Sequence, residues 1–246
     1  VDRKAKNARF HFDDEGANPT RELVLDEPST IGRTTDVPAT IAAMNDALLR
    51  GEHAVALAVK EEQPGVADTA TAESLGIREL VSSQTSYFRG SIAERMQNIE
   101  IAAARFHGIF VAPGATFSMG EALGDVSLDN GFTEAWIIYG GRTIKGVGGG
   151  VCQVSTTLFR TAFFAGFPIV ERYSHAYRVS YYEQTISGRD PLLAGMDATV
   201  YFPLVDFKFV NDTPYWLLME TYFNPTSQSL TWKFYSTSDG RSVTFD

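Results

Sequence analysis

The chain carries its only cysteine in the stretch Lys145-Gly146-Val147-Gly148-Gly149-Gly150-Val151-Cys152-Gln153-Val154-Ser155-Thr156-Thr157-Leu158-Phe159. A run of glycines leads into Cys152, and apolar residues then recur on both faces of a helical pattern. This pattern predicts a buried helix that begins near Val151 and ends near Ala165. Because no second cysteine exists, an internal disulfide and a cysteine-rich zinc site are both excluded.

A cysteine at the glycine-rich start of a helix is in a position that favours a reactive thiol. The bare backbone lets a substrate approach closely, and the positive end of the helix dipole favours thiolate over thiol. We therefore interpret Cys152 as a candidate nucleophile, with an oxyanion pocket formed by backbone N–H groups. The candidate donors of this pocket are Gly150, Val151 and Gln153, and the hydroxyl residues that share the helical face of the cysteine are Ser155 and Thr156. The alternative is a small buried thiol that packs as a hydrophobe.

A cysteine nucleophile needs a base, and the chain has four histidines. His11 lies in a polar N-terminal stretch, and His53 opens a predicted strand of a small first unit. His107 ends a predicted helix, where the dipole favours a cation. His175 follows shortly after the cysteine helix, so elimination and proximity make it the best candidate base. The alternative for His175 is a histidine in a surface loop.

The sequence leaves open which carboxylate would orient His175. The candidates are Glu171, Asp197 and Asp206, although Asp206 could be solvated on an alternating strand and Asp197 could serve a turn. Arg172 flanks the histidine and could bind a substrate carboxylate, or lie at the surface as most arginines do.

Composition and charge exclude several classes of function. The net charge of -9 argues against a dedicated nucleic-acid binder, which would present a basic face. No run of 18 apolar residues predicts a membrane span. The glycine run lacks the lysine of a phosphate-binding loop, and no cluster has zinc spacing, so we expect no cofactor and no metal. Since the chain begins at Val1, a removed N-terminal anchor or signal is possible. The oligomeric state stays open.

The periodicity of the chain predicts two α+β units. Residues 1–75 contain a predicted strand, the helix Val37–Leu49 and a strand over His53–Val59, followed by a linker-like stretch. Residues 76–246 begin with a helix that a Ser91–Glu94 capping box would open. We expect the buried cysteine helix to pack on a mainly antiparallel sheet. A C-terminal β-meander is predicted over 198–202, 205–209, 215–223 and 230–235.

Six ordered sequence blocks between about residues 84 and 220 resemble those of the VanW family. The blocks stand in this order: Arg95-Met96-Gln97-Asn98-Ile99; Pro113-Gly114-Ala115-Thr116-Phe117-Ser118; Gly148-Gly149-Gly150-Val151-Cys152-Gln153-Val154-Ser155-Thr156-Thr157-Leu158; Glu171-Arg172 with His175; Asp197-Ala198-Thr199-Val200; and Asp206-Phe207-Lys208-Phe209-Val210-Asn211. Residues 1–80 resemble, less specifically, the peptidoglycan-binding domain that often precedes VanW domains.

The resemblance implies an exported bacterial protein of the cell envelope, from a family named after an accessory gene of vancomycin-resistance clusters. VanW domains are linked to L,D-transpeptidation with the motif cysteine as nucleophile, which carries over to Cys152, and His175 matches the family's histidine. The blocks also supply the residues expected to support this pair: Asn98, Arg172, Asp197 and Asp206. One departure is the longer segment 183–196, which could act as a lid or reshape the groove.

We therefore expect an L,D-transpeptidase-like enzyme that acts on peptidoglycan stem peptides through a Cys152 thioester. Two alternatives remain at this point. One is a non-catalytic wall-binding module in which Cys152 only packs. The other is a cysteine peptidase or amidase that uses the same residues with water as acceptor, because sequence alone does not separate hydrolysis from transfer.

Overall fold

The computed structural model describes residues 2–14 and 19–244, and it has the α+β fold that the sequence predicts. Its main sheet has four antiparallel strands in the order β5 (Glu79–Tyr87), β15 (Ser229–Ser236), β14 (Leu217–Asn224) and β6 (Ile109–Val111). Side chains alternate across this sheet. Leu217 and Met219 join the large core on one face, whereas Leu218 joins a smaller core on the other.

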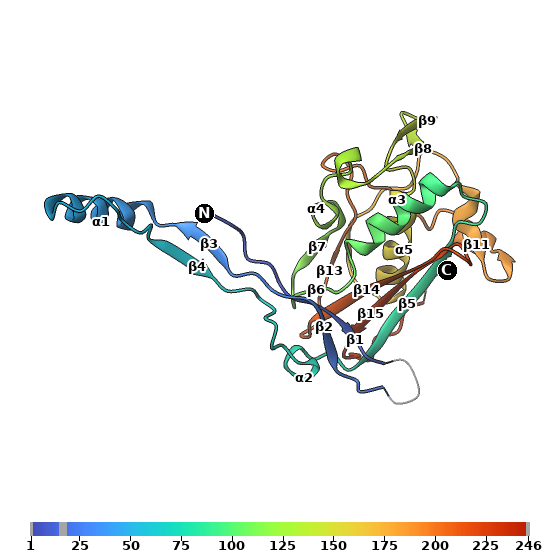
Figure 1. Ribbon diagram of the computed structural model, residues 1–246. Coiled ribbons are helices and arrows are strands. Elements are labelled where there is room, and N and C mark those ends of the chain that lie inside the picture. The colour runs from blue at the N-terminus through green and yellow to red at the C-terminus, as the bar shows by residue number, and fades with distance from the viewer. Residues whose placement is uncertain (1, 15–18, 245–246) are drawn as a thin grey trace.

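The cysteine-bearing helix α5 (Val151–Phe164) lies in the large core, as predicted (Figure 1). It packs on β5 and β15 and against the neighbouring helix α3 (Ala93–Ala104), which crosses β14. Both faces of α5 are apolar, so neither can be left in water. With 14 residues α5 is still short, and among the described residues no helix is long and apolar enough to cross a membrane.

A second antiparallel sheet joins β10 (Ile169–Glu171), β13 (Lys208–Val210) and β7 (Thr116–Ser118). The predicted C-terminal meander is therefore correct only for its last hairpin, β14–β15. The strand predicted over 198–202 does not form, because the backbone of Ala198 bonds to side chains of α5 instead of to a neighbouring strand. The strand predicted over 205–209 lies at β13 and belongs to the second sheet.

Shorter elements surround the start of α5. They are α4 (Met119–Leu123), the hairpin β8 (Glu134–Tyr139) and β9 (Arg142–Val147), the hairpin β11 (Gln184–Thr185) and β12 (Gly188–Arg189), and the 3₁₀ turns η1 (Leu128–Asn130), η2 (Ser180–Glu183) and η3 (Pro191–Leu193). The predicted capping box is wrong: α3 begins at Ala93 without a side-chain cap, and the Ser91 hydroxyl accepts a hydrogen bond from Arg95 at 2.7 Å.

The first part of the chain contributes both to the body and to an arm. The hairpin β1 (Arg9–Phe12) and β2 (Leu23–Glu27) packs through Phe10 and Phe12 on the outer face of the main sheet, near α2 (Ala72–Leu75). The elements that project from the body in Figure 1 are β3 (Gly32–Thr35), α1 (Val37–Leu49) and β4 (Val59–Glu62). Residues 53–58 are not a strand, so β4 starts later than predicted. The boundary near residue 75 stays a prediction.

Glu220 on β14 joins the β1 ribbon to the main sheet. Its side chain is fully buried; Oε1 accepts the Phe12 N–H at 2.7 Å, and Oε2 accepts from the Tyr222 hydroxyl. Burial raises the pKa of this carboxyl, although both hydrogen bonds work in the opposite direction. The charged form of Glu220 is therefore disfavoured in the folded protein.

This raised pKa predicts a specific pH dependence of stability. As the pH rises from the unfolded pKa through the folded pKa, the native state binds more protons, so the free energy of unfolding falls by at most about 1.4 kcal/mol per pH unit. Glu220→Gln should remove that slope in urea denaturations across pH 4 to 8, whereas the exposed control Glu22→Gln should keep it. Identical slopes in wild type and Glu220→Gln would contradict this account.

Candidate active site at Cys152

The glycine run sets Cys152 in the first turn of α5, against the backbone of β8. A Cβ on Gly149 would lie 2.6 Å from the carbonyl oxygen of Trp136. Gly150 is the N-cap with φ of +119°, and a Cβ there would lie 2.8 Å from the backbone oxygen of Arg95. Only glycine allows both this close approach and this left-handed backbone. The run therefore lets α5 begin directly beneath the β8–β9 hairpin.

His175 and Asp197 form a tight pair beside the cysteine. The ring Nδ1 of His175 donates to Asp197 Oδ2 at 2.5 Å, and the backbone N–H of His175 donates to the same oxygen at 2.8 Å. Only 5% of the His175 side chain and 11% of the Asp197 side chain are exposed. Two bonds to one carboxylate oxygen fix both the loop and the ring, and they leave Nε2 as the ring nitrogen that can exchange a proton.

Cys152 and His175 lie close enough that each changes the pKa of the other. Burial works to raise the pKa of the Cys152 thiol, but the hydrogen bond and positive charge of His175 outweigh it, so this pKa is lowered. Burial works to lower the pKa of His175, yet Asp197 and Cys152 together raise it to about 9. Each group therefore favours the charged form of the other, imidazolium for His175 and thiolate for Cys152.

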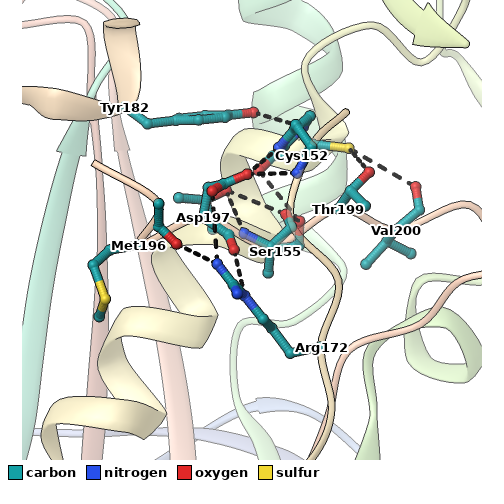
Figure 2. Close-up of polar contacts among 12 residues, drawn as sticks. Cys152, Ser155, Arg172, Tyr182, Met196, Asp197, Thr199 and Val200 are labelled. Carbon is teal, nitrogen blue, oxygen red and sulfur yellow. Dashed lines mark hydrogen bonds and ion pairs between the residues drawn. The ribbon is translucent and has the colours of Figure 1, made fainter. Parts of the chain in front are cut away.

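The segment from Asp197 to Val200 lies across the cysteine. The Cys152 Sγ is 3.4 Å from the Thr199 hydroxyl and 3.8 Å from the Val200 carbonyl (Figure 2). Ser155 donates to the Ala198 carbonyl at 2.6 Å. Two further bonds, both of 3.2 Å, join the Thr156 hydroxyl to the carbonyl and N–H of Ala198. The helical face that carries Cys152 therefore also carries the hydroxyls that hold this segment.

Two arginines also form hydrogen bonds with this segment. Arg172 donates through Nε to the Asp197 carbonyl at 2.7 Å, and its Nη2 lies 3.6 Å from Asp197 Oδ1. The buried Arg160 donates to the carbonyls of Met196 and Tyr182, each at 2.7 Å. Of the roles considered for Arg172, the structure favours support of the pair, because its side chain contacts Asp197 (Figure 2).

The structure resolves the choice of carboxylate in favour of Asp197. Asp206 is buried rather than solvated, and it accepts from the Ser118 hydroxyl at 2.5 Å and from the Gly120 N–H at 2.7 Å, so it anchors α4. Glu171 pairs with Lys208 at 2.8 Å. Neither of these two carboxylates contacts His175, and Asp206 supports the cavity wall instead.

The predicted oxyanion donors are not all available. The N–H of Val151 donates to the Gly148 carbonyl at 3.0 Å, and that of Gln153 donates to the Gly150 carbonyl at 2.8 Å. Within the described part of the chain, the Gly150 N–H donates no hydrogen bond. The side chain of Gln153 points into the core, where it donates to the Ser86 hydroxyl at 2.7 Å. Its Oε1 accepts from Arg95 at 2.8 Å.

Asn98 acts on the glycine run rather than on a substrate. Its Nδ2 donates to the carbonyls of Thr133 and Gly149 at 3.0 and 2.9 Å, and its Oδ1 accepts the Thr133 N–H at 2.8 Å. The side chain is completely buried. Asn98 therefore ties α3 to the start of β8 and to the loop that precedes Cys152.

The longer segment 183–196 packs behind His175. Its buried Glu183 forms ion pairs of 2.6 Å with both Arg178 and Arg189, which hold the pKa of Glu183 well below its usual range. A small cavity of about 230 Å³ separates this segment from His175 and Asp197. The segment thus forms a wall behind the pair.

A large cavity of about 920 Å³ opens in front of Cys152 and His175. Its walls come from α4, from β8–β9 and from residues 199–205. Apolar side chains dominate, and they include Val126, Trp136, Ile137, Tyr201, Phe202 and Leu204. The charged side chains on its walls are Arg95, Glu121 and Asp125. Among the residues that the structure describes, no group of histidine, cysteine and carboxylate side chains could hold a metal ion.

Sequence reasoning missed several residues that shape this site. Tyr182 is buried, and its hydroxyl lies 3.5 Å from His175 Nε2. Thr199 contacts the sulfur, and Arg160 supports two loops from inside the core. Arg160 lies just beyond the block that ends at Leu158. An arginine among the apolar residues of a buried helix was the signal that could have identified Arg160.

A thiol, an imidazole that lowers the pKa of that thiol, and a carboxylate that holds the imidazole line one side of a cavity on an α+β scaffold. Together they define a protein with a cysteine–histidine–aspartate site. The chain belongs to the VanW family, because the family model described as VanW like protein matches residues 94–235.

Two curated relatives match parts of the chain. The uncharacterized protein YoaR of Bacillus subtilis is 39% identical over 126 residues, which cover 51% of this chain and 38% of that protein. The vancomycin B-type resistance protein VanW of Enterococcus faecalis is 28% identical over 116 residues, which cover 47% of this chain and 40% of that protein. The matches thus span less than half of either relative. No solved structure matches the chain.

The coupled pKa values predict how the thiol responds to pH. The inflection in the rate of Cys152 alkylation by iodoacetamide should lie below the pKa of about 8.5 of a free cysteine, because His175 favours the thiolate. In His175→Ala, burial is opposed only by the contacts of the sulfur with Thr199 and Val200, so the inflection should move upward and alkylation at pH 7 should slow by about tenfold. The control His53→Ala changes an exposed histidine and should leave the profile unchanged. A His175→Ala profile equal to that of wild type would refute the coupling.

Proposed function

We propose that this protein is a cysteine-dependent acyltransferase of the bacterial cell envelope that forms 3–3 cross-links between peptidoglycan stem peptides, as an L,D-transpeptidase does. The observation that carries the proposal is the Cys152–His175–Asp197 series at the edge of a large cavity. A merely packed thiol needs neither an oriented histidine nor an opening beside the sulfur.

The geometry supports a two-step reaction. In the first step the Cys152 thiolate attacks the carbonyl carbon of the third stem residue, and His175 protonates the amine that leaves as D-alanine. In the second step the side-chain amine of a neighbouring stem attacks the thioester, and His175 accepts its proton as Cys152 leaves. Asp197 keeps the imidazole oriented in both steps, because it holds Nδ1 and leaves Nε2 to transfer the proton.

The oxyanion of each tetrahedral intermediate needs a hydrogen-bond donor near the start of α5. Gly150 keeps its N–H available there, since Val151 and Gln153 donate to neighbouring carbonyls. One oxyanion donor is worth about 3 kcal/mol of the barrier. The positive end of the α5 dipole adds to this stabilisation.

The size and the lining of the cavity support transfer to a second peptide. A volume of about 920 Å³ is at the upper end for small-molecule sites, so two peptide strands can meet there. Its walls are largely apolar, and exposed aromatic side chains such as Trp136 and Tyr201 flank it. When strands fill such a groove they exclude water, which favours an amine over water as the acceptor.

Similarity to the vancomycin B-type resistance protein supports a substrate in the cell wall, since vancomycin resistance concerns that structure. An extracytoplasmic location follows from such a substrate. A thioester intermediate requires no metal or redox group, and we accordingly assign no cofactor.

The direct test incubates purified protein with tetrapeptide muropeptides and analyses the products by mass spectrometry. Wild type should release D-alanine and form 3–3 cross-linked dimers, and Cys152→Ala should do neither. Asp197→Asn should reduce the rate by about 10³- to 10⁴-fold, because an unoriented imidazole loses its tautomer. Release of D-alanine without dimers would indicate a hydrolase. If wild type and Cys152→Ala give the same product profile and bind sacculi equally well, the proposed reaction is contradicted and the protein is a non-catalytic wall-binding module.

A further inference from the structure

We propose that Arg95 binds the free carboxylate at the C-terminus of the donor peptide, so that the site selects peptides in which the expelled residue is the last one. This inference rests on the proposed function and adds the feature of the substrate that the site recognises. It makes the residue a specificity determinant of the donor.

Arg95 lies on the same wall of the cavity as the catalytic pair. It projects from the first turn of α3, and its guanidinium carbon is 4.6 Å from the centre of the Tyr181 ring. The rings of Tyr181 and Tyr182 are 4.7 Å apart, and the Tyr182 hydroxyl is 3.5 Å from His175 Nε2. Two aromatic side chains therefore lead from the guanidinium to the imidazole.

The charge of Arg95 is not neutralised within the described part of the protein. Its two side-chain hydrogen bonds go to neutral acceptors, the Ser91 hydroxyl at 2.7 Å and the Gln153 amide oxygen at 2.8 Å. A guanidinium has five N–H donors, so three remain. Other arginines near the site do have carboxylate partners: Arg172 has Asp197, and Arg178 and Arg189 have Glu183.

The guanidinium is also held in place before any ligand arrives. Gln153 is fully buried and fixed to the Ser86 hydroxyl, while Gly150 packs against the aliphatic stem of Arg95. A fixed planar guanidinium binds a carboxylate at low entropic cost, because little side-chain freedom remains to be lost. The charge also acts on the site: burial raises the pKa of Tyr182, and Arg95 opposes that rise.

The charges around the cavity would orient the donor peptide within it. Glu121 and Asp125 lie on the wall formed by α4 and the residues after it, and would repel a carboxylate. Arg95 is the only cationic side chain other than the imidazole among the described residues that line this cavity. In a C-terminal residue, one carbon separates the carboxylate from the scissile nitrogen, so the ion pair must form close to Cys152.

The test compares two synthetic stem tetrapeptides, one ending in D-alanine and the other in D-alaninamide. The acyl-enzyme on Cys152 is followed by intact-protein mass spectrometry. Wild type should acylate faster with the acid by about 10- to 100-fold, which is the range for a hydrogen bond to a charged group. Arg95→Gln should lose this preference through a slower reaction of the acid alone. Arg95→Lys should keep part of it.

The matched control is Arg89→Gln. Arg89 also stacks on a tyrosine, at 4.3 Å from the Tyr87 ring, and donates to a backbone carbonyl, but it does not line the cavity. This variant should keep the full preference for the acid. An Arg95→Gln protein that still prefers the acid, or that slows with both peptides equally, would overturn the inference.

A binding measurement separates this inference from the proposed function. Calorimetry with Cys152→Ala should show tighter binding of the acid than of the amide, and Cys152→Ala/Arg95→Gln should bind both equally. If wild type forms no acyl-enzyme while this selectivity appears and is lost, the proposed reaction fails and the carboxylate site stands. Equal binding of the two peptides by Cys152→Ala would refute the site whatever the reaction.

Discussion

The hydrogen bond between His175 Nδ1 and Asp197 Oδ2 is the contact on which the rest of the site depends. It joins the loop after β10 to the segment that crosses Cys152. Without a fixed carboxylate the buried imidazole would lose its charge, and burial would then keep the cysteine as a thiol. The reactivity of the sulfur is therefore set by a residue 45 positions further along the chain.

Helix α5 helps to hold the Asp197 carboxylate in a fixed position, because it carries polar side chains inside the core. Ser155 and Thr156 hold Ala198, next to the carboxylate, and Arg160 holds the carbonyls of Tyr182 and Met196. Burial of the Arg160 guanidinium lowers its pKa to about 10 despite nearby carboxylates, so its placement costs free energy. Such groups are tolerated when each finds a partner, and their bonds position the loops.

The sequence identified the parts of the site that lie close together in the chain. Glycines before Cys152 and apolar residues after it predicted the buried helix, and nearness to that helix predicted His175. Partners distant in sequence were less accessible: the choice among Glu171, Asp197 and Asp206 depends on long-range packing. The strand predicted over 198–202 is absent for the same reason. The alternation of residues predicts that this backbone pairs in a sheet, but a side chain of α5 forms hydrogen bonds with the backbone of Ala198 instead. The family resemblance supplied the correct blocks but not their contacts.

The central claim is that Asp197 and Cys152 hold His175 as an imidazolium, whose charge in turn favours the Cys152 thiolate. Nitrogen-15 NMR of the His175 ring across pH 5 to 10 measures its protonation directly. The account predicts a doubly protonated ring at pH 7.5 that titrates near 9 in wild type, and a lower pKa in Cys152→Ala, where the thiolate is absent. A ring that titrates near 6.5 in wild type, with no change in Cys152→Ala, would contradict the account.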